Sequence, residues 1–283
     1  MKTVEERVLD AIDVEGMIAY LCELVGIHRR GGEETPAQEH IAAKMREIGL
    51  DVDVWPLDFE ALRRHPAFSY EIERTEGLGV VGVMGEDAGG RSLIFNGHID
   101  VVPEGDPANW TTPPFQGVVR DGAVYGRGAL DMKGGLCCAL FAAKALRDAG
   151  VHLKGKLMVE SVVGEEDGGT GALAAVLRGY HADGAVIPEP TALAVIPAQA
   201  GAMNFRVTVP GYSAHGCMRE EGVSAIEKFI PLYQALVELE RVRNQGVDDP
   251  LFVDYSLPFP LSVGTLQAGN WASTVPERLT FEG

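Results

Sequence analysis

The amino-acid sequence predicts an α/β protein with a mixed, mostly parallel sheet flanked by helices, followed by a smaller α+β domain. In residues 1–197, short apolar and β-branched runs alternate with segments of helical periodicity, which is typical of a parallel sheet with helical crossovers. In residues 198–283 the order becomes strand, helix, strand, strand. The chain has 283 residues, of which 46% are hydrophobic, and this is enough for more than one domain.

The first part of the larger domain is expected to contain two helices and three strands. Apolar positions at mostly helical spacing predict one amphipathic helix over residues 5–26. A second helix is expected to have Thr35 as its N-cap, with Pro36 after it, and to end at Gly49. The expected strands are residues 51–55, 80–84 and 92–96, the last two joined by a turn, and residues 57–77 are expected to be a polar surface connection.

The remaining elements follow from the same patterns. A proline- and glycine-rich loop over residues 103–117 and a hairpin around Asp121-Gly122 precede a helix that is expected to begin at Asp131 and to reach Arg147. Residues 156–163 are apolar along most of their length, as in a strand that is covered on both faces. The other expected elements are a helix at 170–178, a buried strand at 184–187, strands at 202–209, 262–266 and 278–281, and a helix at 223–242.

Histidine and acidic residues follow three of the predicted strands. His98 lies just beyond one strand, Glu165 and Glu166 follow a second, and Glu189 follows a third. In open α/β sheets, ligands bind at the carboxyl ends of the strands, so these side chains are expected to meet there. Asp131, at a strand-to-helix junction, is expected to join them.

These residue types fit a site for two metal ions. Histidine and carboxylates without cysteine suit zinc, cobalt or manganese, and a carboxylate such as Asp131 can bridge two ions with its two oxygens. Asp100 fits an acid that holds the His98 imidazole in one tautomer. Neighbouring residues in an extended chain point in opposite directions, so one of Glu165 and Glu166 can bind metal while the other acts as a base.

Each of these residues also has a plainer interpretation when it is considered alone. Asp131 could be a helix N-cap, and His98 could be a hydrogen-bonded histidine at the end of a strand. The two adjacent glutamates could belong to a solvated acidic loop. The shared position of the motifs at strand ends favours the metal site over these alternatives.

Composition excludes several other classes of function. The formal net charge of -17 argues against a nucleic acid or an anionic membrane as a partner. No run approaches the roughly 18 apolar residues that span a bilayer, and the N-terminus lacks the apolar segment of a signal peptide. The four cysteines show no C-x-x-C spacing, so a cytoplasmic location is expected, with Cys137 and Cys138 as buried residues of a helix.

Five short motifs follow one another along the chain. They are Asn-Gly-His-Ile-Asp-Val-Val (96–102), Gly-Arg-Gly-Ala-Leu-Asp-Met-Lys-Gly-Gly (126–135), Gly-Glu-Glu-Asp-Gly-Gly-Thr-Gly (164–171), Pro-Glu-Pro-Thr (188–191) and Gly-Tyr-Ser-Ala-His-Gly (211–216). Together and in this order they resemble the M20 family of zinc aminoacylases and peptidases, which includes acetylornithine deacetylase, succinyl-diaminopimelate desuccinylase and carboxypeptidases of the G2 type. Ordered matches along nearly the whole chain are far more specific than a single short motif.

The resemblance implies a zinc-exopeptidase-like catalytic domain, formed here by residues 1–197, and two zinc ions per full-length subunit, with cobalt or manganese as alternatives. His98 and Glu189 would hold one zinc ion, and Glu166 would hold the other. Asp131 would bridge the two ions, and a strained or cis peptide bond after this residue is typical of the family.

The resemblance also implies roles in catalysis and assembly. Asp100 would orient the histidine ligand, and Glu165 would be the general base. Residues 198–283 would form most of a lid that pairs with a second subunit, so that His215 stabilises the oxyanion in the partner's site. Asn270, in a region that matches the family only loosely, would contact substrate.

Family members that resemble this chain are longer, because their chain returns from the lid to the catalytic domain and supplies a last histidine ligand. We therefore expect these residues to be the N-terminal two-thirds or so of such a hydrolase, with one zinc site nearly complete and the other one ligand short. The remaining histidines are not expected to replace that ligand, because they lie away from the strand ends: His28, His40, His65, His152 and His181.

The principal hypothesis is metal-dependent hydrolysis of an amide bond in N-acyl amino acids or small peptides by a homodimeric enzyme. Family features suggest a substrate that carries a carboxylate. The alternative is a catalytically inactive, dimerising scaffold or ligand-binding protein of the same fold. A serine hydrolase that uses Ser213 and His215 is excluded, because these residues form no nucleophile elbow and no Gly-x-Ser-x-Gly motif is present.

Overall fold

The computed structural model describes residues 2–27, 31–199 and 201–283. The chain divides into two compact units, Met1–Ala194 and Val195–Gly283, which we call the larger and the smaller unit. The expected domain boundary was after residue 197. Within the described ranges, no helix combines the length and the apolar character needed to cross a membrane.

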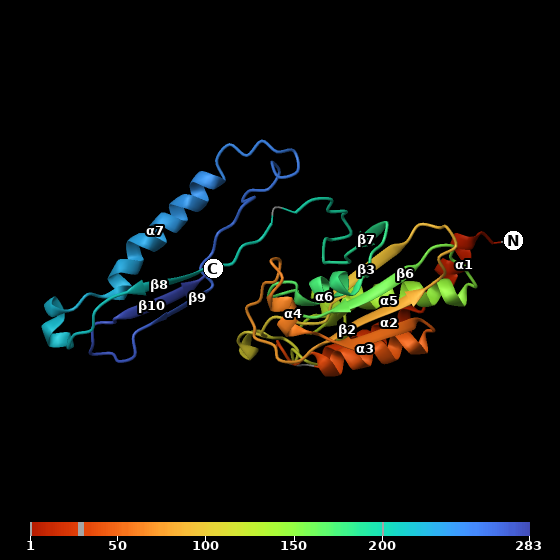
Figure 1. The fold of residues 1–283 in the computed structure, drawn as a ribbon, viewed down its shortest axis with the longest axis horizontal. Coiled ribbons are helices and arrows are strands. Elements are labelled where there is room, and N and C mark those ends of the chain that lie inside the picture. Colours follow the sequence, from red (N-terminus) through yellow and green to blue (C-terminus); the bar gives the residue numbers. More distant parts are fainter. Residues whose placement is uncertain (1, 28–30, 200) are drawn as a thin grey trace. The chain divides into compact units, whose positions relative to one another are not determined.

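The larger unit is built on a five-stranded sheet with the order β1-β2-β6-β3-β7 (Figure 1). Strand β3 is parallel to both β6 and β7, whereas β2 is antiparallel to both β1 and β6, so every strand except β2 points the same way. The predicted fold class, a mixed and mostly parallel sheet flanked by helices, is confirmed. The strands are β1 (Asp51–Pro56), β2 (Leu78–Met84), β3 (Leu93–His98), β6 (Leu157–Val162) and β7 (Gly184–Val186).

Helices cover both faces of this sheet. One face packs against α3 and α5: a side chain at Gly82 would meet Met45 of α3, and one at Gly97 would meet Leu136 of α5. The other face packs against α6, where a side chain at Gly171 would overlap the backbone just after β6. The helices of this unit are α1 (Val4–Asp10), α2 (Val14–Gly26), α3 (Thr35–Glu47), α4 (Phe59–Arg63), α5 (Gly134–Asp148) and α6 (Thr170–Arg178).

Two short helical turns and a hairpin complete the larger unit. The turns are η1 (Pro107–Asn109) and η2 (Ala129–Lys133), and the predicted hairpin is present as β4 (Val118–Arg120) and β5 (Ala123–Tyr125). The hairpin does not pair with the five-stranded sheet. The chain therefore reaches Asp131 from outside that sheet.

The prediction of a single helix over residues 5–26 is wrong, because the structure has two helices there, α1 and α2. Thr3 and Glu6 form a capping box for α1, and Asp13 accepts a hydrogen bond from the Gly16 amide and begins α2. Each helix thus has its own N-terminal cap, which divides the segment. The region 57–77 likewise contains α4, which the sequence did not predict.

Three further expectations about this unit are corrected. Asp131 does not begin a helix, because its backbone is not helical and α5 starts at Gly134. Strand β7 is exposed rather than buried, and it lies at the edge of the sheet. Cys138 is exposed on the outer side of α5, whereas Cys137 is buried as expected.

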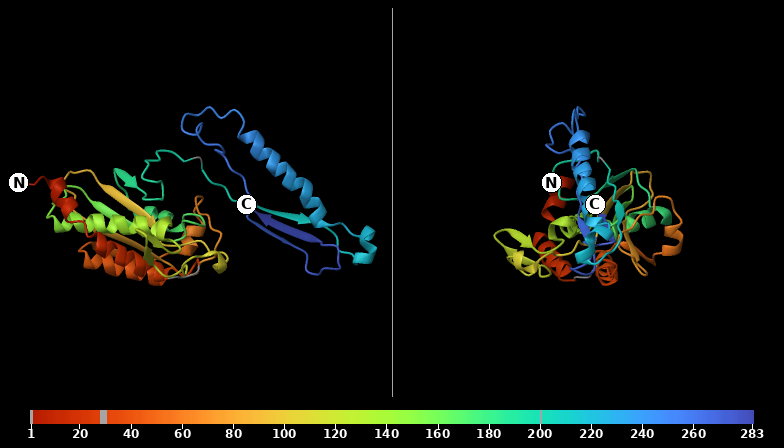
Figure 2. Two further views of the ribbon diagram at one scale, coloured as in Figure 1. Left: turned by 180° about the vertical axis from the view of Figure 1, so that it is seen from behind. Right: turned by 90° about the vertical axis from the view of Figure 1, so that its left-hand side faces the viewer.

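The smaller unit has the predicted order of strand, helix, strand and strand. Its antiparallel sheet has the order β8-β10-β9, and α7 packs on one face of it (Figures 1 and 2). Phe229 of α7 contacts Phe281 of β10 with 4.9 Å between ring centroids. The elements are β8 (Arg206–Pro210), η3 (Gly216–Glu221), α7 (Ala225–Arg243), β9 (Thr265–Ala268) and β10 (Arg278–Glu282).

Gln38 of α3 provides a test of how the helix is held on the sheet. Its buried side-chain amide donates to the carbonyls of Leu78 (3.0 Å) and Ser161 (2.8 Å) and accepts from the Ser161 hydroxyl (2.5 Å). Replacing Gln38 with Ala should lower the free energy of unfolding by about 3 kcal/mol, because buried polar groups on β2 and β6 lose their partner. Urea unfolding followed by tryptophan fluorescence measures this loss. The neighbouring exposed Glu39→Ala is the control, and equal stability of the two variants would contradict the prediction.

Candidate functional site

His98 is the centre of a cluster of ionisable side chains at the carboxyl end of the sheet. It is the last residue of β3, and only 1% of its surface is exposed. Its Nδ1 lies 2.9 Å from the backbone carbonyl oxygen of Asp100. Because a carbonyl only accepts hydrogen bonds, Nδ1 carries the proton, and in the neutral ring Nε2 is left with a free lone pair. This is the arrangement of a metal-binding imidazole.

Carboxylates from three other segments surround Nε2 of His98. Its distance is 3.1 Å to Oδ1 of Asp131, 3.8 Å to Oε1 of Glu189 and 3.9 Å to Oε2 of Glu165. Glu189 follows β7, and Glu165 follows β6, so the sheet brings both to the end of β3. The structure therefore brings together residues that are up to 91 positions apart in the sequence, from His98 to Glu189.

These side chains form two groups that could each hold a metal ion. In one group, ligand atoms of His98, Glu165 and Glu189 lie within 4.8 Å of one another, and in the other those of His98, Asp131 and Glu166 do so. The resemblance assigned Glu165 only the role of general base, but its carboxylate also belongs to one of the two groups that could hold a metal ion. Neither group includes any of the other described histidines, and His28 lies outside the described residues.

The turn that carries Asp131 is fixed by close contacts on two sides. Lys133 is buried, and its Nζ donates to the carbonyl of Leu24 on α2. At Gly135 a side chain would overlap the carbonyl oxygen of Pro188, so the start of α5 lies directly against the segment that carries Glu189. The peptide bond after Asp131 is cis, as the resemblance implied.

Asp100 organises the glutamate segment rather than the imidazole alone. Its buried carboxylate accepts hydrogen bonds from the backbone amides of Glu165 (3.3 Å) and Glu166 (3.1 Å), while Oδ1 is 3.8 Å from Nδ1 of His98. Glu165 and Glu166 lie in a turn, not in the extended chain that the sequence suggested. Their carboxylates nevertheless belong to different ligand groups.

The proximity of so many acids changes their protonation. Burial, and then repulsion by Asp131, raises the pKa of Glu166 from 4.5 to about 7. Burial also raises the pKa of Glu165 and of Glu189 above their ordinary values. Burial lowers the pKa of His98, but attraction by nearby carboxylates, Asp100 foremost, outweighs it, so this pKa is raised overall. A cluster of this kind is stabilised by added positive charge, either protons or metal ions.

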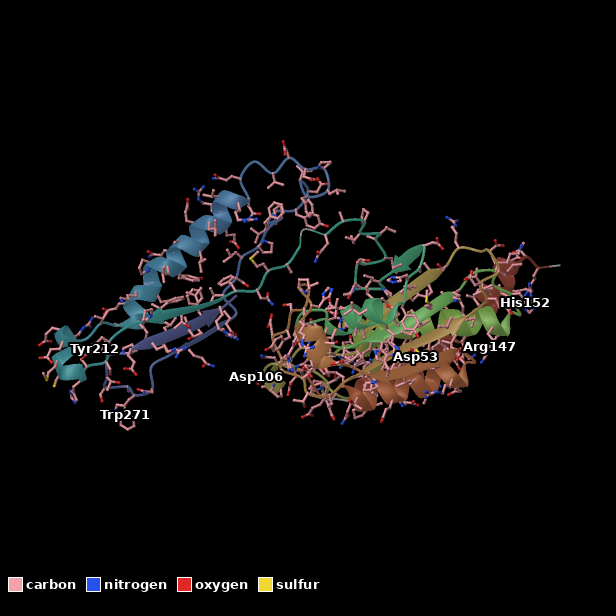
Figure 3. All side chains as sticks on the ribbon, viewed as in Figure 1. Asp53, Asp106, Arg147, His152, Tyr212 and Trp271 are labelled. Atoms are coloured by element: carbon pink, nitrogen blue, oxygen red, sulfur yellow. The ribbon has the colours of Figure 1, made fainter. Side chains whose placement is uncertain are left out.

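The other two predicted site residues belong to the smaller unit. His215 precedes η3, and its Nδ1 accepts a hydrogen bond from the Cys217 amide at 3.2 Å. Asn270 is exposed in the turn after β9, where it helps line a hollow of about 560 Å³. Tyr212 and Trp271, both exposed, lie at the same end of this unit (Figure 3).

Sequence reasoning missed a second layer of charged residues below the site. Arg74, Glu34 and Asp167 form a buried group of ion pairs next to the glutamate turn. Arg74 lies in the region 57–77, which was expected to be a surface connection, so no periodic pattern pointed to it. Asp167 belonged to a recognised motif, but the sequence did not indicate its partner.

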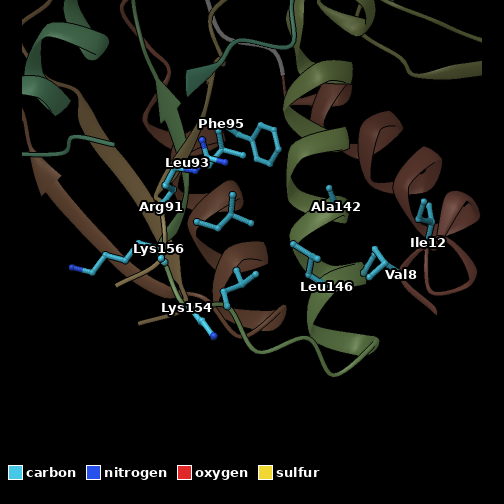
Figure 4. A pocket seen from close by; sticks show the side chains of 14 residues that line it. Val8, Ile12, Arg91, Leu93, Phe95, Ala142, Leu146, Lys154 and Lys156 are labelled. Carbon is cyan, nitrogen blue, oxygen red and sulfur yellow. The ribbon is translucent and has the colours of Figure 1, made fainter. Parts of the chain in front are cut away.

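Two hollows in the larger unit differ in chemistry. The one of about 1060 Å³ adjoins the cluster and is lined by Asp100, Glu166 and residues of neighbouring loops. The other, of about 510 Å³, lies beside the first residues of β3 and β6, at the opposite end of these strands (Figure 4). Its lining is mainly apolar with Arg91, Lys154 and Lys156, and it includes no histidine or carboxylate. Of these two hollows, only the first adjoins the cluster, so only it could admit a substrate to these side chains.

Comparisons with known proteins identify the family and the fold of the chain. Residues 94–257 match the family model described as peptidase family M20/M25/M40. The N-formyl-4-amino-5-aminomethyl-2-methylpyrimidine deformylase of Halalkalibacterium halodurans is 38% identical over 215 residues, which are 72% of this chain and 47% of that protein. The succinyl-diaminopimelate desuccinylase 2 of Ruegeria sp. is 30% identical over 225 residues, which are 76% of this chain and 54% of that protein. The chain thus spans about half the length of these curated relatives.

Solved structures show similarity in fold. A di-peptidase of Saccharomyces cerevisiae has a TM-score of 0.68 at 13% identity, over 98% of this chain and 71% of that one. A metallo-carboxypeptidase of Sulfolobus solfataricus has a TM-score of 0.61 at 15% identity, over 94% of this chain and 70% of that one. At these identities the likeness supports the fold.

The cluster predicts how the stability of the metal-free protein depends on pH. The pKa of Glu166 is raised from 4.5 to about 7 in the folded state. Between pH 4.5 and about 7 the folded protein therefore binds more protons than the unfolded chain. Stability should therefore fall as pH rises from about 5 to about 8, and the raised pKa of His98 acts in the same direction. Thermal unfolding of the metal-free protein at a series of pH values measures this. Glu166→Gln should flatten the dependence, and an unchanged slope would contradict the assignment.

Proposed function

Because the chain belongs to peptidase family M20/M25/M40, we propose that it carries the metal-binding part of a hydrolase that cleaves an amide bond in a small N-acyl compound or peptide. The observation that carries the proposal is the convergence of His98 with the carboxylates of Asp131, Glu165, Glu166 and Glu189 at one end of the sheet. Few structural roles account for so many acids around one buried imidazole, whereas a hydrolytic metal site requires them.

The donor set fits divalent metal ions. His98 presents Nε2 to the carboxylates and is held by its other nitrogen, as metal-binding histidines are. We assign His98 and Glu189 to one zinc ion and Glu166 to the other, with Asp131 between them. Imidazole and carboxylate ligands without thiolate also accommodate cobalt or manganese.

The residues of the chain divide the hydrolysis between them. Divalent ions at such a site polarise the scissile carbonyl and lower the pKa of a water. Glu165 is placed beside the ligands and is about half exposed, so its carboxylate can take a proton from the attacking water. The same proton then passes to the leaving nitrogen, so that the amine departs neutral and Glu165 is regenerated. Asp100 holds the backbone of Glu165 during both transfers.

The relatives suggest a substrate class. One is named as a deformylase of an N-formyl pyrimidine compound, and the other as a desuccinylase of succinyl-diaminopimelate. We therefore propose an N-acylated small amine as substrate, and an N-formylated aminomethylpyrimidine is the first compound to test.

The smaller unit is proposed to serve as a lid and as the contact between two subunits. Its helix α7 exposes a stripe of apolar side chains at helical spacing, which supports a protein contact there: Ile226, Ile230, Tyr233 and Val237. In this proposal His215 stabilises the oxyanion in the partner's site, and Asn270 binds substrate. A cytoplasmic location is also proposed, and the four free cysteines support it.

Glu165 gives the direct test of catalysis. Glu165→Gln should lower kcat by a factor of about 100 to 10,000, as expected for loss of a general base, while the fold is retained. Hydrolysis of N-formyl and N-succinyl amines by the purified zinc-loaded protein is measured, with the exposed Glu47→Gln as control. Unchanged turnover would remove Glu165 from this role. Metal binding without hydrolysis of any acylated compound would favour the alternative of an inactive scaffold.

His98 tests the metal assignment separately. Both ligand groups share this residue, so His98→Ala should reduce bound zinc to near zero, as measured by elemental analysis after dialysis against metal-free buffer. The matched control is His152→Ala, which belongs to neither group. Zinc retained by His98→Ala at the wild-type level would show that the metal lies elsewhere.

A further inference from the structure

A buried group of three charged residues lies directly behind the glutamate turn. The side chain of Arg74 is 2% exposed, and those of Glu34 and Asp167 are 4% and 5% exposed. Nη1 of Arg74 lies 2.7 and 2.8 Å from the two carboxylate oxygens of Asp167, and Nη2 lies 2.8 Å from Oε1 of Glu34. The planar guanidinium thus holds two carboxylates at once, which only arginine can do with this geometry.

The three residues join segments that are far apart in the chain. Glu34 immediately precedes α3, Arg74 lies between α4 and β2, and Asp167 lies in the turn that contains Glu165 and Glu166. The backbone adds to this link, since the amide of Ile72 donates to Oδ2 of Asp167 at 2.8 Å and the amide of Glu71 donates to its carbonyl at 2.9 Å. The turn is therefore held to the body of the unit through Asp167.

The opposite side of the turn is held by Asp100. This carboxylate accepts the amides of Glu165 and Glu166, as described above. At Gly168 a side chain would overlap the carbonyl of Ser69, so the turn also lies in close contact with the chain that leads to Arg74. Asp100 on one side and Asp167 on the other leave the two glutamates between fixed points.

Arg74 is not arranged to bind substrate. Although it borders the hollow beside the cluster, its side chain is almost fully buried, and Nη1, Nη2 and Nε all face the carboxylates of Glu34 and Asp167. Its ion pair with Asp167 is therefore its strongest link to the turn, and the guanidinium also lies against Gly164 at the start of that turn.

We propose that Arg74 is a positioning residue that, through Asp167, holds the turn carrying Glu165 and Glu166 in the conformation that directs them to the two ligand groups. The proposal rests on the metal site of the proposed function. Without Arg74, repulsion among the acids of the cluster and between Glu34 and Asp167 would push the turn outward.

The experiment compares four variants with the wild type. Arg74→Met removes the ion pairs with Glu34 and Asp167, and Arg74→Lys keeps the positive charge but lacks the planar guanidinium. The double variant Glu34→Gln with Arg74→Met removes one charge of each sign, so the formal charge of the group is unchanged. This variant is therefore less destabilised than Arg74→Met alone, which leaves two buried carboxylates without a cation. Leu50→Ala, in the core beneath α3, is the control for a general loss of stability.

Two measurements separate the proposal from the function on which it rests. Hydrogen exchange of the metal-free protein reports protection of the amides of residues 165–168, and a chelator competition reports zinc affinity. The double variant and Arg74→Met should lose at least tenfold protection in this turn relative to the rest of the unit, and at least tenfold zinc affinity. Arg74→Lys should give intermediate values, and Leu50→Ala should keep both relative protection and affinity.

The outcomes are distinct. Wild-type protection of the turn and zinc affinity within twofold of wild type in the double variant would overturn the role of Arg74. If Arg74→Met does not fold, the double variant decides. If the wild type binds no zinc, the proposed function fails, while hydrogen exchange still shows whether Arg74 holds the turn.

Discussion

Four carboxylates lie around a single buried imidazole in the larger unit, and their mutual repulsion is the constraint on which the surrounding structure depends. Burial, and then repulsion by Asp131, raises the pKa of Glu166 to about 7, so the acids are costly to keep together in their charged forms. They stay together only if the backbone that carries them is fixed by other interactions. The fold supplies these interactions in two ways, through the sheet and through buried polar contacts.

The parallel strands β6, β3 and β7 set the positions of Glu165, His98 and Glu189, because each of these residues lies at or just beyond the end of its strand. Contacts behind the site then fix their directions. Asp100 holds both the His98 ring and the glutamate amides, and Lys133 ties the Asp131 turn to α2. The site is therefore pre-organised by residues that do not bind the metal, and a metal ion would replace protons rather than rearrange the backbone.

The predictability of each residue follows from the kind of signal that it leaves in the sequence. His98, Glu165 and Glu189 could be predicted because strand periodicity locates the end of each strand, and a parallel sheet brings those ends together. Asp131 could be predicted from its place at a strand-to-helix junction, but the sheet alone does not position it, because it follows a hairpin outside the sheet. Arg74 left no signal: its partners are 40 and 93 residues away, in a region without periodicity, and only the folded structure shows that it is buried.

The two ligand groups are also unequal, and this follows from their shared histidine. Nε2 of His98 has one lone pair, so it can bind one ion at a time, while both groups contain this atom. Whichever ion takes His98, the described residues offer the other only carboxylate oxygens. Imidazole favours zinc over harder ions, whereas oxygen ligands discriminate less between zinc and manganese. If His98 and Glu189 hold one ion, as proposed, that side would therefore select zinc more strongly than the side of Asp131 and Glu166. Asp131 would lie next to both sides, since its Oδ1 is 3.1 Å from Nε2 of the shared histidine.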